Sequence, residues 1–221
     1  MKDLRITSLY DLNETIAPDF MKTAKYPWQL FSHINGAIRE LGETLSPDFF
    51  DRTGSDIWIA KTATVAPTAV IEGPCIIDAS TEIRHATYIS GALIGKFAIV
   101  ENSTVKNSIL FNWVQLLFNN YVCDSIIGSK TRIGAGAMIS NNKADGTLVN
   151  IKAGKVIESA LKTIGAMVGD NVEIGCNTVL NPGTVIGRNS VIYPLSMVRG
   201  FVPENSVYKK QGEIVDRISA Y

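Results

Sequence analysis

Few side chains in this sequence of 221 residues could perform acid–base, nucleophilic or metal chemistry. The two histidines are His33 and His85, so a zinc site that needs three histidines is excluded, and the sequence requires no metal. We assign His33 to packing or to the surface, and retain His85 as the histidine that could act as a general base. The cysteines are odd in number, widely spaced and without a CxxC pair, which indicates reduced thiols: Cys75, Cys123 and Cys176.

The composition limits the classes of partner. Lys plus Arg and Asp plus Glu number 21 each, so the net charge is zero and gives no electrostatic case for nucleic acid or an acidic membrane surface. No apolar stretch approaches the length of a membrane span, and the first ten residues lack the apolar centre of a signal peptide. We therefore expect a cytoplasmic protein without a membrane span.

Aliphatic residues at a fixed interval of six indicate the elements that must position any site. Four residues after most of them comes a small side chain, such as Thr81 or Thr178, which we also expect to point inward. A helix would need an interval near 3.6, and a sandwich would show irregular strand lengths. The ladder comprises Ile59, Val65, Ile71, Ile77, Ile83, Ile89, then Ile127, Ile133, Ile139, then Val168, Ile174, Leu180, Ile186, Ile192 and Val198.

The interval has a geometric reason. A strand rises roughly 3.3 Å per residue, so six residues make one flat face and the bend to the next face. Three faces close a triangular coil, and successive coils stack at about 4.8 Å, which places ladder residues in a continuous aliphatic column. The pattern predicts an all-β fold, a parallel β-helix. We expect glycines such as Gly134 and Gly175 to allow tight bends after the ladder residues.

Segments without the repeat divide the chain. Residues 1–57 form a predicted N-terminal segment, in which Pro27 and apolar residues at helical spacing predict an amphipathic helix over about 27–44. We expect its apolar face to cover the open end of the β-helix or a neighbouring chain. The β-helix spans 58–202, with a loop excursion at 140–163 where the ladder fails. A tail, 203–221, is expected to form a short helix with Ile214, Ile218 and Tyr221.

Several short stretches carry a family resemblance. The hexapeptide pattern resembles the left-handed β-helix acyltransferases, an exception to right-handed crossovers. More narrowly, the chain resembles the acetyltransferase half of bifunctional N-acetylglucosamine-1-phosphate uridylyltransferases and their shorter relatives. The stretches that carry this resemblance are 82–85, 106–111, 120–125, 133–136, 175–183 and 193–200.

The resemblance implies roles for the sugar substrate. Arg84 and Lys106 would hold the phosphate of an amino-sugar phosphate, which needs fixed cationic donors. Asn120, Tyr121 and Asn141 would bind the sugar, and Asn141 would orient its nucleophilic nitrogen or hydroxyl.

The resemblance also implies a cofactor and an assembly. Ala135 and Cys176 would line a groove for coenzyme A and its acetyl thioester, with acetyl-CoA as co-substrate. Three chains would associate as a homotrimer, and each site would lie in the cleft between adjacent prisms. Because fold alone does not give function, these roles are expectations.

One departure from the resemblance concerns the general base. The family has Pro-His where this chain has Leu117 and Phe118, and a Phe side chain cannot accept a proton. A positioned base contributes typically 10² to 10⁴ in rate. His85 is the remaining candidate. The basic residue expected in the following loop is also absent from its place, although three lysines lie nearby: Lys143, Lys152 and Lys155.

Two hypotheses stay open. The first is an acetyl-CoA-dependent acyltransferase that acts on an amino-sugar phosphate or nucleotide sugar in cell-envelope metabolism. Nucleotidyltransferase activity is not expected, because no Gly-rich phosphate loop occurs near the start. The second is a catalytically silent relative that binds a sugar nucleotide, or pairs with a separate nucleotidyltransferase as a regulatory or assembly subunit. Joint retention of Arg84, Lys106, Tyr121 and Asn141 favours the first.

Overall fold

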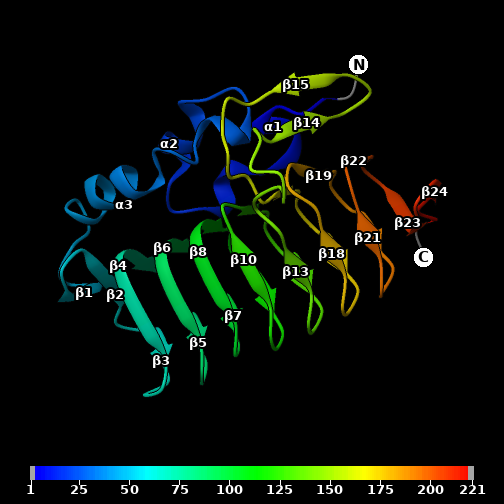
Figure 1. Ribbon diagram of the computed structural model, residues 1–221. Helices are drawn as coiled ribbons and strands as arrows, with labels where there is room; N and C mark the ends of the chain where they lie inside the picture. The colour runs from blue at the N-terminus through cyan, green and yellow to red at the C-terminus, as the bar shows by residue number, and fades with distance from the viewer. Residues whose placement is uncertain (1–2, 219–221) are drawn as a thin grey trace.

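The chain forms a left-handed parallel β-helix whose coils stack along one axis (Figure 1). Its structure is a computed structural model that describes residues 3–218. The predicted fold class is confirmed. Side chains at six-residue intervals point inward: Ile83, Ile133, Ile174 and Ile192 are at most 2% exposed and belong to one continuous core. Each such burial contributes about 1.5 to 3 kcal/mol.

Each coil has three faces. The first, which we call the mixed face because its outward residues are polar, charged and apolar in no regular order, is made of short parallel strands. They are β3 (Thr64–Val65), β5 (Glu82–Ile83), β7 (Ile99–Val100), β9 (Gln115–Leu116), β12 (Arg132–Ile133), β17 (Glu173–Ile174), β20 (Val191–Ile192) and β23 (Ser206–Lys210).

The second face, called the site face below, begins with three long strands that bend and continue onto the third face. These are β4 (Val70–Ile77), β6 (Tyr88–Ile94) and β8 (Thr104–Leu110). The site face continues with shorter parallel strands: β10 (Tyr121–Cys123), β13 (Met138–Ile139), β18 (Val179–Leu180) and β21 (Met197–Val198).

The third face, called the covered face, carries apolar side chains on its outer side as well as its inner side. Besides the ends of β4, β6 and β8 it contains β2 (Ile57–Ala60), β11 (Ile126–Ile127), β16 (Ala166–Val168), β19 (Thr184–Ile186) and β22 (Phe201–Val202). Six of its outward residues are at most 2% exposed: Ile76, Leu93, Ile109, Ile126, Met167 and Val185.

The N-terminal segment lies on this covered face. Its elements are α1 (Ile6–Leu9), η1 (Leu12–Glu14), α2 (Pro18–Lys22), η2 (Pro27–Gln29) and α3 (Ile34–Gly42). Helix α3 packs on β4, β6 and β8, and the segment shares a second core with the outward residues of the face. The prediction that the helix covers the open end of the β-helix or a neighbouring chain was wrong. The helix packs instead on the apolar outward residues of the covered face.

The helix predicted over 27–44 is interrupted. A 3₁₀ turn ends at Gln29, and the α-helix begins only at Ile34. The 3₁₀ turn and the residues that follow it bury Trp28, Leu30 and Phe31, each at most 4% exposed. Among residues 3–218, no helix is long and apolar enough to span a membrane.

Antiparallel strands pair with both ends of the solenoid. Strand β1 (Phe50–Gly54) pairs with β2, and β24 (Glu213–Asp216) pairs with β23. Both cover sheet edges that would otherwise expose unpaired backbone groups. The predicted C-terminal helix was therefore wrong: Ile214 lies in β24, Ile218 is 92% exposed beyond it, and Tyr221 lies outside the described residues.

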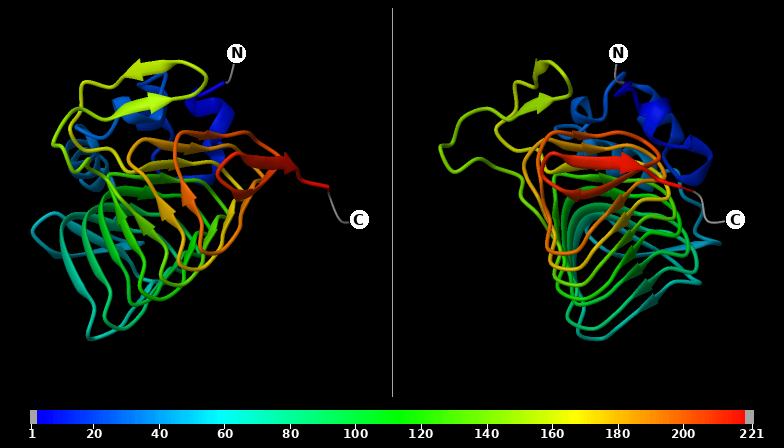
Figure 2. Two further views of the ribbon diagram at one scale, coloured as in Figure 1. Left: turned by 45° about the vertical axis from the view of Figure 1, so that its right-hand side comes forward. Right: turned by 90° about the vertical axis from the view of Figure 1, so that its right-hand side faces the viewer.

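The loop excursion leaves the β-helix after β13 and returns before β16. It contains an antiparallel hairpin, β14 (Asn150–Lys152) and β15 (Val156–Glu158), which lies beside the N-terminal segment (Figure 2). Val149 and Ile151 are fully buried in the second core. The excursion is thus an ordered element packed on the same side as the helices.

Candidate functional site

The candidate site lies where the site face meets the covered face, a bend we call the second corner. Asp124 is 9% exposed there, and its carboxylate accepts hydrogen bonds from the side-chain amides of two residues on adjacent coils. Asn107 Nδ2 donates at 2.5 Å and Asn141 Nδ2 at 2.6 Å. Asp124 and Asn107 adopt positive φ (47° and 43°), as the sharp bend requires. Asp124 thus fixes the Asn141 amide, and its role at the corner is structural.

Tyr121 and Cys123 stand next to this corner on β10. A hydrogen bond to Cys123 is the largest cause that raises the pKa of Tyr121, to about 12, and burial adds to it. Burial likewise raises the pKa of the Cys123 thiol. At neutral pH both groups are protonated. Tyr121 can therefore donate or accept a hydrogen bond, but it is not suited to removing a proton from a substrate.

Lys106 lies on the neighbouring strand β8, paired in register with Cys123. Its ammonium is 4.7 Å from the centroid of the Tyr88 ring, and the Tyr88 hydroxyl donates to Glu72. That hydrogen bond raises the pKa of Tyr88. Lys106 is exposed and makes a cation–π contact, so its charge is available to an anion at this corner.

Arg84 lies at the opposite edge of the site face, in the bend from the mixed face that we call the first corner. Its guanidinium pairs with Glu82 at 2.8 Å and with Glu101 at 2.9 Å, which raises its pKa. Two carboxylates therefore compensate its charge. Within one chain the structure does not bring Arg84 and Lys106 to one point, so their joint phosphate role stays a prediction.

His85 also lies at the first corner. Its Nδ1 is 2.8 Å from the Thr68 hydroxyl. Backbone bonds link His85 to Asn102 and Asn102 to Asn119, so His85 lies two coils from residues 118–119. At about 4.8 Å per coil this is roughly 10 Å. His85 is thus displaced from the place where the resemblance expects the base.

The predicted coenzyme residues form one column at the first corner. Phe118, Ala135 and Cys176 follow one another on successive coils, since Gly136 donates to the carbonyl of Phe118 and Asn177 to that of Ala135. Cys176 is exposed, unlike the other two cysteines, and all three thiols are free.

Gly134 explains how closely these coils approach. A Cβ on Gly134 would lie 2.8 Å from the backbone nitrogen of Cys176, although its φ is not positive. The expectation that Gly134 and Gly175 serve tight bends was therefore wrong. They permit close stacking, since a Cβ on Gly175 would lie 2.3 Å from the backbone of Pro194.

Asn120 has a structural role. It is 3% exposed, and its Nδ2 donates to the carbonyls of Gly134 (2.8 Å) and Ala137 (3.3 Å) on the next coil. The side chain is directed into the bend, so the structure does not place it where the expected sugar contact would occur.

A cleft of about 660 Å³ opens beside Asn141, between the loop excursion and the later coils. Lys143, Lys152 and Arg199 line it together with a single carboxylate, Asp145, so its walls carry a net charge of +2. Hydrogen bonds from Thr147 lower the pKa of Asp145. Among the residues described, neither Lys152 nor Arg199 has an ion-pair partner. The cleft is lined by Ser140, Asn142, Lys143, Ala144, Asp145, Asn150, Lys152, Val156, Asn181, Pro182, Gly183, Arg199 and Gly200.

The arrangement suits an anionic ligand with polar substituents, because Ser140 and Asn142 on either side of Asn141 line a positive cleft, and the Tyr121 phenol and the Lys106 ammonium lie on the two preceding coils. Residues 3–218 contain no group of three His, Cys, Asp or Glu side chains that could hold a metal ion.

Two protein families match the part of the chain that carries the six-residue repeat. Residues 71–164 match the GMPPB C-terminal domain, and residues 165–200 match the bacterial transferase hexapeptide (six repeats). The two matches adjoin and cover most of the β-helix. Most of the β-helix is therefore similar to these two families.

Two curated relatives of this hexapeptide-repeat protein are bifunctional. The chain is 32% identical over 161 residues to the bifunctional sugar-1-phosphate nucleotidylyltransferase/acetyltransferase of Sulfurisphaera tokodaii. This alignment covers 63% of this chain and 40% of the relative. The chain is also 32% identical over 174 residues to the bifunctional protein GlmU of Methanococcus aeolicus, covering 68% and 42%. The chain thus spans less than half the length of either relative.

A solved structure gives a more distant likeness. The acetyltransferase domain of PglB from Neisseria gonorrhoeae, in complex with acetyl coenzyme A, is 14% identical, with a TM-score of 0.29 and coverage of 73% of this chain and 57% of that one.

Proposed function

We propose that this protein transfers an acetyl group from acetyl-CoA to an amino-sugar phosphate or nucleotide sugar, and performs no nucleotidyl transfer. The observation that carries the proposal is the position of Asn141. Its amide is fixed by Asp124, and its two neighbours in the sequence, Ser140 and Asn142, line the positively charged cleft. The names of the relatives, which include acetyltransferase and sugar-1-phosphate, support this substrate class.

The reaction requires few groups. The nitrogen or hydroxyl of the sugar attacks the carbonyl carbon of the thioester, a C–N or C–O bond forms, the C–S bond breaks, and coenzyme A leaves as the thiol. The nucleophile loses one proton, which must pass through a base or water to the departing sulfur, so that coenzyme A is released as the thiol. Asn141 and Tyr121 would orient the sugar, and Lys106 would attract its phosphate, with Arg84 contributing from the first corner.

The cofactor would bind along the column of the first corner. Ala135 and Cys176 would line the groove for the acetyl thioester of acetyl-CoA. Phe118 is 50% exposed in the same column, so an apolar surface adjoins this groove. His85 is our candidate for the proton acceptor, acting on a substrate that extends over two coils.

A second copy of the chain would complete the groove. The site face and the adjoining first corner expose an apolar row while the covered face is already occupied, and such a row is a feature of association surfaces. We propose a homotrimer in the cytoplasm with this row at the subunit contacts. The exposed side chains are Phe118 (50%), Met138 (50%), Val179 (37%), Leu195 (80%) and Met197 (56%).

The second candidate function is a silent relative that binds a sugar nucleotide, or assists a separate nucleotidyltransferase as a regulatory or assembly subunit. The presence of Phe118 favours it, because the resemblance expects a histidine there. Both described histidines lie elsewhere, with His33 before α3 and His85 two coils away.

Thiol release from acetyl-CoA in the presence of glucosamine 1-phosphate separates the two functions. The transferase proposal expects release by the native protein and a loss of at least tenfold in Asn141→Ala. Release only in Phe118→His would support the silent relative. Asp216→Ala, a change in the terminal hairpin, is the matched control and should retain the native rate.

A further inference from the structure

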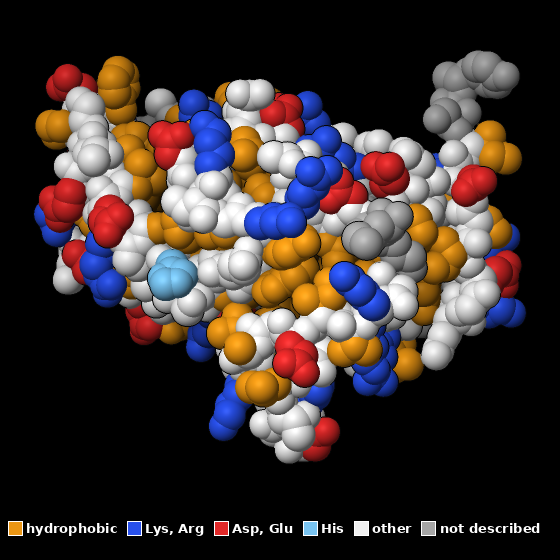
Figure 3. Space-filling view, turned by 90° about the horizontal axis from the view of Figure 1, so that it is seen from above, with side chains coloured by type: hydrophobic (Ala, Val, Ile, Leu, Met, Phe, Trp, Pro, Cys, Tyr) orange, Lys and Arg blue, Asp and Glu red, His pale blue; other side chains and the backbone are white. Residues whose placement is uncertain are grey.

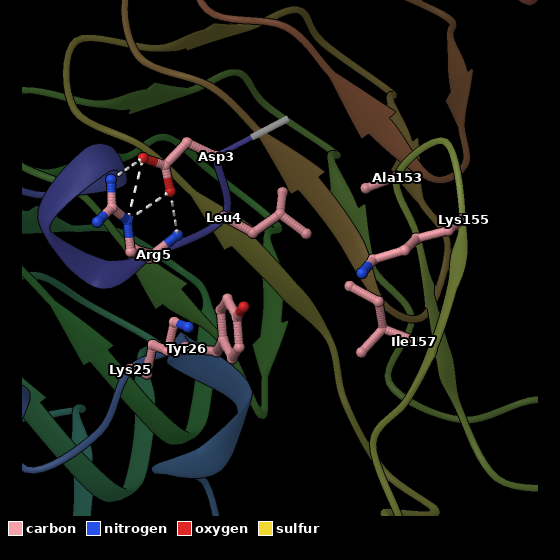
Figure 4. A pocket seen from close by; sticks show the side chains of 8 residues that line it. All are labelled: Asp3, Leu4, Arg5, Lys25, Tyr26, Ala153, Lys155 and Ile157. Carbon is pink, nitrogen blue, oxygen red and sulfur yellow. Dashed lines mark hydrogen bonds and ion pairs between the residues drawn. The ribbon is translucent and has the colours of Figure 1, made fainter. Parts of the chain in front are cut away.

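A second pocket, the hairpin pocket, lies between the N-terminal segment and the β14–β15 hairpin (Figure 4). Its volume is about 310 Å³, near the lower end for small-molecule sites. It lies outside the face on which the proposed reaction takes place. The lining residues are Asp3, Leu4, Arg5, Lys25, Tyr26, Ala153, Lys155 and Ile157.

The pocket carries two uncompensated positive charges. Asp3 and Arg5 pair with each other at 2.5 Å, and this pairing lowers the pKa of Asp3. Lys25 and Lys155 come from opposite walls, and within residues 3–218 neither is in an ion pair. In the view from above, Lys and Arg side chains stand around an apolar area near the middle of this side of the molecule (Figure 3).

The remaining walls are apolar and aromatic. Leu4, from the N-terminal segment, is 4% exposed, and Ala153 (8% exposed) and Ile157 lie on the hairpin opposite it. The Tyr26 ring stacks on Trp28, with centroids 4.7 Å apart and an interplanar angle of 3°, so its orientation is fixed. An apolar floor, a held aromatic ring and two ammonium groups together suit an anion with a planar ring, of the size of a nucleoside monophosphate.

The hairpin joins this pocket to the cleft of the candidate site. Ile151 pairs with Ile157, and Lys152 pairs with Val156. Because side chains alternate along a strand, Lys152 and Val156 line the cleft while Ile157 lines the hairpin pocket. A ligand held against Ile157 would also fix the strands that form one wall of the cleft.

We propose that the hairpin pocket binds a nucleoside monophosphate and that its occupancy fixes the β14–β15 hairpin over the cleft. The first part stands on the pocket alone. The second part rests on the proposed function, since it makes the ligand a regulator of that site.

Calorimetric titration of the full chain with AMP and with UMP tests the binding. We expect binding to the native protein, at least tenfold weaker binding in Lys25→Gln and in Lys155→Gln, and unchanged binding in Arg199→Gln, which alters only the cleft. Absence of binding by both nucleotides would overturn the proposal. So would a loss in Arg199→Gln with none in the two pocket variants.

Hydrogen exchange of the hairpin amides tests the coupling. At a saturating concentration of the bound nucleotide we expect slower exchange over 150–158 in the native protein, and unchanged exchange at the same concentration in Lys155→Gln. Native exchange that is unaffected by nucleotide would refute the coupling. Neither measurement depends on acetyl transfer, so failure of the proposed function and failure of this inference are distinguishable.

Discussion

The side-chain amide of Asn141 donates a 2.6 Å hydrogen bond to the carboxylate of Asp124, its neighbour on the preceding coil. The same carboxylate accepts a bond from Asn107 on the coil before that. Three coils are thus joined at the second corner through one acid. The position of the Asn141 amide therefore depends on a residue that itself is 9% exposed.

Replacing this acid should affect stability and ligand binding together. In Asp124→Ala two amides lose their acceptor, and we expect the free energy of unfolding to fall by about 1 to 3 kcal/mol. Urea denaturation measures the change. Asp145→Ala, in the exposed loop, is the control and should change stability by less than about 0.5 kcal/mol. Equal effects of the two substitutions would contradict the role given to Asp124.

Two neighbouring residues of strand β17 test whether the ladder side chains point into the coil. Ile174 is 2% exposed inside the coil, whereas Glu173 beside it is exposed. We expect Ile174→Ala to cost about 2 to 5 kcal/mol and Glu173→Ala about 0.5 kcal/mol or less. A small cost for Ile174→Ala would mean that its side chain is not in a packed column.

A charge introduced at an outward position should destabilise the fold on the covered face but not on the site face. Leu93 is 2% exposed beneath α3, and Val179 is 37% exposed on the site face. Leu93→Asp buries an unpaired carboxylate and should lower stability by several kcal/mol, about 3 or more. Val179→Asp should leave the fold intact and should dissociate the proposed trimer, measured by light scattering. A native protein that is monomeric at micromolar concentration would refute the trimer.

The phenol of Tyr121 predicts a pH dependence. Its pKa of about 12 exceeds the value of about 10 for an unfolded tyrosine, so folding favours the neutral form. The associated stability is fully present below about pH 10 and is lost as the pH rises toward 12, because the unfolded chain releases the proton first. NMR titration of labelled tyrosine, assigned with Tyr121→Phe, measures the pKa. Cys123→Ala should lower it, and an unchanged value would exclude the hydrogen bond as the cause.

Much of the fold could be predicted because the coil repeats locally. Ile77 belongs to the six-residue ladder, and its burial follows from the interval alone. Its neighbour Ile76 is equally buried, yet it points outward from the coil. Its burial depends on the docking of α3, a contact between segments far apart in the sequence, and the repeat contains no information about that contact.

The site was predictable to a similar extent. Lys106, Tyr121 and Asn141 were identified by resemblance, and the structure places them on adjacent coils. Arg84 was expected beside Lys106, but it lies across the site face in two ion pairs. The position of Lys152 in the cleft depends on how the excursion folds back, and an excursion without a repeat gives no such signal.

The central claim is that acetyl transfer takes place at the site beside Asn141. The most direct measurement is mass spectrometry of glucosamine 1-phosphate after incubation with the native protein and acetyl-CoA labelled with ¹³C in the acetyl group. We expect a sugar phosphate that carries the labelled acetyl group, in an amount at least tenfold lower with Asn141→Ala. Labelled product formed equally by the native protein and by Asn141→Ala would contradict this claim.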